Sequence, residues 1–217
     1  MDGLTLAPAD AGVPAVDGIR VGIGGWVFPP WRGRFYPKGL VQRRELEYAS
    51  RQLSAIEING TYYGTQTPAV YAGWREQTPP GFVFTAKAPK RITQARALER
   101  TGPQVEDFVG GIAALEDRLG ALVWQFDAGT RIDRDAFAAF LGLLPREAGG
   151  RPLRHVLDVR DRGFVDAGFV ELLAEGAEAV SLIKAQRMGL GVQFQFRIAQ
   201  LACALDQRFQ HLGEFHG

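Results

Sequence analysis

Residues 105–124, VEDFVGGIAALEDRLGALVW, join a helical repeat to a short apolar run. Apolar side chains recur at spacings of three and four, which predicts one buried face of a helix over Val105–Leu119 that ends at Gly120. The run Ala121–Trp124 is too short for a buried helix and apolar enough for a buried strand. The stretch therefore predicts a helix that leads directly into a strand of a sheet covered by helices.

The same alternation recurs on both sides of this stretch. Four more short apolar runs are predicted strands: Ile19–Ile23, Ala55–Ile58, Phe82–Ala86 and His155–Val159. Two further helical patterns lie at Glu45–Leu53 and Asp135–Leu144. Strands that alternate with helices at intervals of about 30 residues or more are typical of right-handed βαβ units with a parallel sheet. The predicted fold class is therefore α/β.

Two parallel architectures, an open doubly wound sheet and a closed (β/α)₈ barrel, are consistent with this pattern. The glycines of Val21–Gly25 do not form the G-x-G-x-x-G fingerprint, and Pro29 and Pro30 block the helix that should follow it. These features favour a TIM-barrel-like repeat over a dinucleotide-binding fold. Eight units usually need about 250 residues. With 217 residues, the barrel is predicted to be incomplete or atypical at its C-terminus.

The composition, with 46% hydrophobic and 23% charged residues, is typical of a globular protein. We expect a flexible leader over residues 1–18 and a single domain over 19–217. A net charge of +1 gives no general attraction to nucleic acid or membranes. The single Cys203 excludes an intramolecular disulfide and multi-cysteine metal sites. No apolar run approaches the ~18 residues of a membrane span, and the first residues do not resemble a signal peptide, so a cytoplasmic location is expected.

Several motifs in the same order resemble the YecE-like family, the domain of unknown function 72. The motifs are GIGGW at Gly22–Trp26, WRGRFYP at Trp31–Pro37, EINGTYY at Glu57–Tyr63 and LDVR at Leu157–Arg160. The resemblance covers roughly residues 19–173. It implies a TIM-barrel-like fold, and it implies no established reaction.

The tail, residues 174–217, contains no motif of this resemblance. Residues Val192–Phe209 alternate glutamine with apolar residues, a pattern that fits either a helix or an irregular strand. A frameshift, a truncation or a lineage-specific replacement would each explain this divergence. The sequence therefore leaves the closure of the barrel and the oligomeric state open.

The candidate catalytic residues follow from the rule that side chains at the C-terminal ends of barrel strands line the active site. The rule selects Glu57, Lys87 and Asp158. As a carboxylate pair, Glu57 and Asp158 would supply a general acid and a general base, and Lys87 would bind an anion. Ion pairs of Glu57 with Lys87 and of Asp158 with Arg160 are the structural alternative.

The candidate binding residues surround that group. They are Trp26, Asn59, Tyr63, Gln125 and Arg160. If the strand stays extended, its alternation would place Asn59 and Thr61 on the same face as Glu57. The aromatic rings suit a planar ligand such as a sugar face or a base, although packing is the simpler explanation. Basic residues also gather in the loops 32–44 and 87–100. If both loops lie at the C-terminal mouth of the barrel, their positive charge would attract a phosphorylated ligand or nucleic acid. For either loop alone, exposure to solvent is a sufficient reason for the basic residues.

Metal chemistry has little support in the sequence. Of the three histidines, His155 begins a predicted strand at the end opposite the mouth, where it is expected to belong to the core. A single divalent ion, Mg²⁺ or Mn²⁺, on Glu57 and Asp158 is the remaining metal hypothesis. No cofactor is identified.

Three functional hypotheses follow. The first is an acid–base enzyme acting on a phosphorylated sugar, a nucleotide or a nucleic acid at the C-terminal mouth of the barrel. The second is a non-catalytic binding module for an anionic or aromatic ligand. The third is a truncated or frameshifted inactive copy. The residues do not decide whether the chain is an enzyme.

Overall fold

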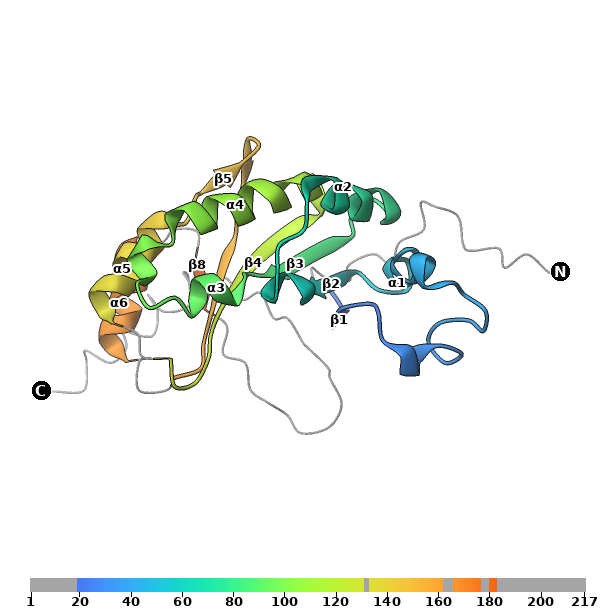
Figure 1. Ribbon diagram of the computed structural model, residues 1–217, viewed down its shortest axis with the longest axis horizontal. Coiled ribbons are helices and arrows are strands. Elements are labelled where there is room, and N and C mark those ends of the chain that lie inside the picture. Colours follow the sequence, from blue (N-terminus) through green and yellow to red (C-terminus); the bar gives the residue numbers. More distant parts are fainter. Residues whose placement is uncertain (1–18, 131–132, 162–165, 177–179, 183–217) are drawn as a thin grey trace, which may run out of the picture.

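The predicted strands pair in parallel and in the order in which they occur along the chain (Figure 1). The computed structural model describes residues 19–130, 133–161, 166–176 and 180–182. The strands of the six-stranded sheet are β1 (Gly22–Gly24), β2 (Ala55–Ile58), β3 (Val83–Lys87), β4 (Leu119–Phe126), β7 (His155–Val159) and β8 (Val180–Leu182). Strands β5 (Glu147–Ala148) and β6 (Arg151–Pro152) form a separate antiparallel hairpin.

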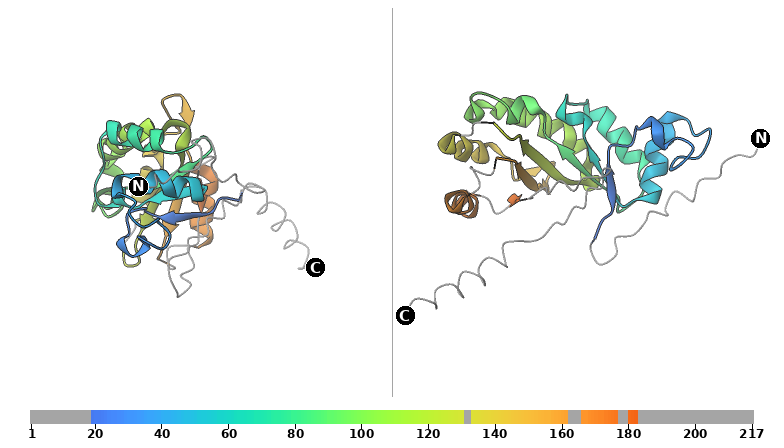
Figure 2. Two further views of the ribbon diagram at one scale, coloured as in Figure 1. Left: turned by 90° about the vertical axis from the view of Figure 1, so that its right-hand side faces the viewer. Right: turned by 90° about the horizontal axis from the view of Figure 1, so that it is seen from below.

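The longer helices cover one face of this sheet, as Figures 1 and 2 show. They are α1 (Glu45–Gln52), α2 (Pro68–Gln77), α4 (Gly102–Ile112), α5 (Arg134–Leu143) and α6 (Ala167–Gly176), and the short helix α3 (Lys90–Thr93) follows β3. Short 3₁₀ helices are η1 (Pro29–Trp31), η2 (Gln42–Arg44), η3 (Gly60–Tyr62), η4 (Leu98–Arg100) and η5 (Ala113–Arg118). Within the described ranges, no helix combines the length and apolar character needed to cross a membrane.

Strand order and helix placement together distinguish the two expected architectures. A doubly wound sheet reverses its strand order and carries helices on both faces. Here the order β1-β2-β3-β4-β7-β8 never reverses, and the helices share one face. The fold is therefore the predicted TIM-barrel-like α/β arrangement.

This alternation continues into the segment that the sequence motifs do not reach. Helix α6 runs past Leu173 to Gly176, and β8 pairs in parallel with β7 through His155 and Val180. The first part of the tail thus supplies a sixth strand. The expected leader 1–18 and the stretch Val192–Phe209 lie outside the described residues.

The core is divided by the sheet because successive side chains of a strand point to opposite faces. The large cluster lies between the sheet and the helices and includes Ile56, Ile58 and Trp124. A second, small cluster of Ala121, Val123 and Val156 lies on the other face of the sheet. Glu57 alternates with the isoleucines of β2, so its carboxylate also faces away from the helices.

The helix predicted over Val105–Leu119 is shorter than its apolar pattern. Helix α4 ends at Ile112, and a 3₁₀ segment follows in which Glu116 adopts a φ of +49°. The prediction that the helix ends at Gly120 is therefore wrong, because Gly120 lies inside β4. A Cβ at Gly120 would lie 2.2 Å from Val83 Cγ1, so the glycine permits the close approach of β3 and β4.

A similar close approach makes Gly22 a sensitive position in β1. A Cβ there would lie 2.3 Å from the backbone oxygen of Ala55, its register partner in β2. We expect Gly22→Ala to lower the free energy of unfolding by about 3 kcal/mol, because the two backbones must separate. Urea unfolding measures this loss. Gly142→Ala in α5 is the control, since nothing lies within 4 Å of its Cβ; equal losses in both variants would contradict the account.

His155 lies in the core at the start of β7, as the sequence predicts. Trp124 Nε1 donates to His155 Nδ1 at 3.0 Å, which leaves Nε2 to donate to the Pro145 carbonyl at 2.7 Å. These two contacts require the neutral imidazole. Burial lowers the pKa of His155, and the hydrogen bond to Pro145 only partly opposes that effect.

We expect the stability of the protein to fall as the pH drops below the ordinary histidine pKa of about 6.5. Between that value and the lowered pKa of His155, the unfolded chain binds more protons than the folded one, so the free energy of unfolding rises with pH. Urea unfolding of the protein and of His155→Gln, from acid to neutral pH, measures the effect. The glutamine can keep both hydrogen bonds without titrating. An unchanged pH dependence in that variant would show that other groups cause it.

Candidate active site

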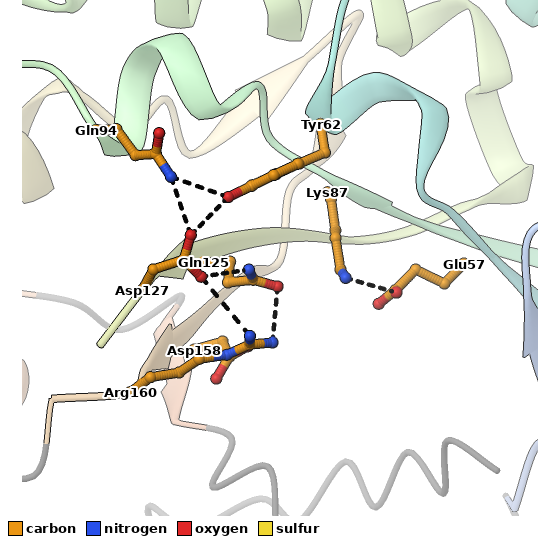
Figure 3. A network of polar contacts seen from close by, with 8 residues as sticks. All are labelled: Glu57, Tyr62, Lys87, Gln94, Gln125, Asp127, Asp158 and Arg160. Carbon is orange, nitrogen blue, oxygen red and sulfur yellow. Dashed lines mark hydrogen bonds and ion pairs between the residues drawn. The ribbon is translucent and has the colours of Figure 1, made fainter. Parts of the chain in front are cut away.

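Polar side chains gather where the parallel strands end (Figure 3). The residues drawn there are Glu57, Tyr62, Lys87, Gln94, Gln125, Asp127, Asp158 and Arg160. Gln125 and Asp158 are register partners on β4 and β7, and Lys87 is the last residue of β3. Because the carboxyl ends of parallel strands share one edge, side chains from separate segments of the sequence converge here.

Glu57 and Lys87 form a largely buried ion pair. Glu57 Oε1 lies 3.4 Å from Lys87 Nζ, and the two side chains are 3% and 16% exposed. Burial raises the pKa of Glu57 and the charge of Asp158 adds to that rise, while Lys87 opposes it. The three residues that the sequence selected as catalytic, Glu57, Lys87 and Asp158, are thus electrostatically coupled. A buried carboxyl group with a raised pKa is suited to accept and release a proton during a reaction.

The segment after β2 positions Lys87 rather than extending the polar face. Strand β2 ends at Ile58 and Asn59 adopts helical backbone angles, so the strand does not stay extended and Asn59 and Thr61 do not continue the face of Glu57. Thr61 Oγ1 instead lies 3.0 Å from the carbonyl of Ile58 and 2.6 Å from that of Lys87. This hydroxyl ties the end of β2 to the end of β3.

Arg160 joins the ends of β4 and β7. Its Nε and Nη2 each lie 3.1 Å from Asp158 Oδ2, and Nη2 also donates to Gln125 Oε1 at 2.9 Å. The Gln125 amide donates in turn to Asp127 Oδ1 at 2.7 Å. Asp158 therefore forms the ion pair with Arg160 that was expected as the structural alternative to a catalytic role. The Gln125 amide is fixed through both its oxygen and its nitrogen.

A second group at this edge was missed by the sequence prediction. Tyr62 donates to Asp127 Oδ2 at 2.8 Å, and Gln94 donates to the same oxygen at 2.9 Å and to the Tyr62 hydroxyl at 3.1 Å. Burial and the neighbouring Asp127 raise the pKa of Tyr62 to about 12. Burial alone would raise the pKa of Asp127, but hydrogen bonds from Tyr62 and Gln125 lower it overall. This part of the edge therefore holds one ionised carboxylate and one neutral phenol.

The signal for Asp127 was present in the sequence. The predicted strand ended at Trp124, whereas β4 continues to Phe126 and Asp127 follows it directly. The strand-end rule would have selected Asp127 with the correct boundary. Gln94 carries no such signal, because it follows α3 in the loop after β3.

The two aromatic candidates lie in different places. The Trp26 ring packs 5.0 Å from that of Trp74 in α2 and 6.2 Å from that of Phe84, and it lines a pocket of about 500 Å³ near α1 and α2. It therefore lies on the helix side, away from the position predicted for it at the mouth. Tyr63 is 76% exposed, with its ring 5.4 Å from that of Tyr62 and 5.3 Å from Lys90 Nζ.

Many of the clustered basic residues are paired with acids. Arg32 contacts Glu45 at 2.6 Å, Arg44 contacts Glu47 at 2.8 Å, and Arg91 contacts Asp107 at 2.8 Å. These pairs fit the solvated-surface explanation of the two loops. Among the described residues, no group of three or more His, Cys, Asp or Glu side chains is arranged to hold a metal ion.

The chain is similar to known proteins both in sequence and in fold. The UPF0759 protein YecE of Escherichia coli K12 is 32% identical over 140 residues, which are 63% of this chain and 48% of that protein. YecE of E. coli O157:H7 matches equally. The chain thus spans about half the length of the curated relatives it matches.

Crystal structures of a DUF72 family protein from Enterococcus faecalis V583 are similar in fold. One superimposes with a TM-score of 0.58 at 18% identity, covering 76% of this chain and 59% of that one. Another gives a TM-score of 0.50 at 19% identity, covering 63% and 57%. The family model described as "Protein of unknown function DUF72" matches residues 20–199, which extends the match beyond the sequence motifs into the tail. The chain therefore belongs to the DUF72 family, and it is similar in sequence to YecE of E. coli.

Proposed function

We propose that the protein is an acid–base enzyme whose proton-transfer group is Glu57. The observation that carries the proposal is the environment of this carboxyl: it is 3% exposed, its pKa is raised by burial, and it faces Lys87 at 3.4 Å. Proton transfer needs a group that can take up and release a proton, and carboxyl groups with perturbed pKa values are concentrated at active sites.

The neighbouring side chains suit the other tasks of such a site. Lys87 can stabilise negative charge that develops on the substrate when a proton is removed. Asp158 acts as the second carboxylate. Arg160 holds it in place, and Gln125 accepts a hydrogen bond from Arg160 in turn. The reaction class is therefore a proton transfer that leads to isomerisation or hydrolysis.

The proposed substrate is a small phosphorylated molecule. Tyr63 offers an exposed ring at the rim of the mouth, and the ammonium of Lys90 lies 5.3 Å from it. A ring beside a cation suits a sugar or base that carries a phosphate. The same pair supports a second candidate, a binding module that holds this ligand without converting it.

Thermal unfolding with a ligand panel tests the proposal. D-ribose 5-phosphate, D-fructose 6-phosphate, AMP and a short single-stranded DNA are the probes. A bound ligand at 100 times its Kd stabilises the fold by about 2.7 kcal/mol, a Tm increase of roughly 5–10 °C. A ligand that raises Tm and is consumed supports the enzyme. One that raises Tm and is recovered unchanged supports the binding module, and a panel without effect contradicts both.

A further inference from the structure

Two neighbouring oxygens on the inner face of the sheet are closed to solvent and make no hydrogen bond with good geometry to any described residue. Glu57 Oε1 has only its ion-pair contact with Lys87 Nζ at 3.4 Å, and Thr85 Oγ1 has no hydrogen-bond partner in the described part of the chain. Glu57 and Thr85 are register partners on β2 and β3, so their side chains lie next to each other on the same face. The residues are only 3% and 7% exposed. Buried polar atoms are nearly always hydrogen-bonded, so this pair indicates a place for a polar group from outside the chain.

The chemistry of the two oxygens restricts that group. A carboxylate oxygen only accepts a hydrogen bond, whereas a threonine hydroxyl can donate or accept one. A ligand hydroxyl meets both needs, because it donates to Glu57 and accepts from Thr85. A phosphate has only acceptor oxygens when ionised, and its charge would be repelled by Glu57 and by the nearby Asp158.

The cations near this pair already face carboxylates. Lys87 lies 3.4 Å from Glu57, and Arg160 contacts both Asp158 and Asp127. Lys90 differs from them, because none of the ion pairs formed between described residues includes it and it lies over the Tyr63 ring. Negative charge on a ligand is therefore accommodated at the rim, and hydroxyl groups are accommodated on the inner face.

We infer that Glu57 and Thr85 bind a hydroxyl group of the substrate, and that the substrate is a phosphorylated sugar with its hydroxyls directed inward and its phosphate at Lys90. This inference rests on the proposed function and selects the sugar phosphate over the nucleotide and the nucleic acid. Lys87 lies one layer above Thr85 on β3, toward the edge of the sheet. Its flexible side chain is the group that moves aside when the sugar enters.

Calorimetric titration of wild-type protein and Thr85→Val tests the inference. The probes are D-ribose 5-phosphate, D-fructose 6-phosphate, D-glucose 6-phosphate and inorganic phosphate. Valine keeps the shape of threonine and removes the hydroxyl, so we expect about a tenfold loss of affinity for the sugar phosphate that binds. Thr85→Ser keeps a hydroxyl and should restore most of the affinity. Affinity for inorganic phosphate should not change.

Thr78→Val is the matched control. Thr78 is also buried, but it ends α2 and precedes β3, which places it at the opposite end of the sheet from the mouth. Its replacement should leave sugar phosphate binding unchanged. Lys90→Ala should weaken inorganic phosphate and the sugar phosphates together.

Three outcomes would overturn the inference: none of the sugar phosphates binds the wild-type protein, Thr85→Val binds them normally, or Thr85→Val weakens inorganic phosphate equally. Normal binding by Thr85→Val would also identify the occupant of the two oxygens as water. The proposed function fails separately, because it requires Glu57→Gln to lose turnover whatever the effect at Thr85.

Discussion

Glu57→Gln should lower kcat by about 10²–10⁴-fold on a substrate that the wild-type protein converts, because the amide cannot exchange a proton with it. Affinity for the ligand should stay close to that of the wild type, since glutamine keeps the size of glutamate and one acceptor oxygen. The fold should also persist, but with a lower free energy of unfolding, because the substitution removes the carboxylate that faces Lys87 in this buried pair. Steady-state kinetics, calorimetric titration and urea unfolding measure these three quantities.

Glu106→Gln is the matched control for this variant. Glu106 lies on the exposed face of α4, so its replacement should change neither turnover nor stability. Turnover that survives in Glu57→Gln would show that another group moves the proton. Lost affinity together with lost turnover would favour the binding module, in which the carboxylate holds the ligand.

The stability of Glu57→Gln should also differ from wild type in its pH dependence. Burial raises the pKa of Glu57, so the folded chain binds this proton more tightly than the unfolded chain does. The resulting stabilisation is complete below the unfolded pKa and is lost as the pH rises through the raised pKa. The variant lacks this titration. Its free energy of unfolding should therefore decline less than that of the wild type over this pH window.

Trp124→Ala should lower the free energy of unfolding by about 4–5 kcal/mol, a large part of the stability of a typical domain. The Trp124 ring is fully buried, at 6.0 Å from that of Phe108 in α4 and 5.4 Å from that of Phe140 in α5. Its loss would open a cavity between the sheet and both helices. The variant also removes the donor to His155 Nδ1, which leaves a buried acceptor unpaired.

Tyr63→Ala is the control for this loss. Tyr63 is 76% exposed, so truncating it should change stability by less than about 0.5 kcal/mol. Urea unfolding at neutral pH compares the two variants. If Trp124→Ala lost no more stability than Tyr63→Ala, the placement of Trp124 at the centre of the core would be contradicted.

The sequence located five of the six strands of the sheet, because each of these five is a short apolar run between polar or glycine-containing segments, and it did not predict β8. Ala55–Ile58 and His155–Val159 agree with β2 and β7 residue by residue. The helix over Val105–Leu119 was overextended, because its apolar spacing continues through the 3₁₀ segment and past the turn at Glu116. The positive φ of Glu116 cannot be read from a pattern of apolar residues.

Part of the candidate site was also predicted from the sequence. Glu57, Lys87, Gln125, Asp158 and Arg160 converge because strand ends in a parallel sheet meet at one edge. Trp26 follows a strand as well, but its ring turns to the helix side to pack on Trp74. Which way a loop side chain turns depends on packing partners distant in the sequence, and the strand-end rule carries no information about them.

Direct titration of the Glu57 carboxyl by carbon NMR tests, without a substrate, whether Glu57 can serve as the proton-transfer group. We expect a midpoint above the usual glutamate value of about 4.3, because the carboxyl is buried and lies near the charge of Asp158. Lys87→Met should raise the midpoint further, since it removes the cation 3.4 Å away. A midpoint at or below the usual value would contradict the assignment of Glu57 as the proton-transfer group.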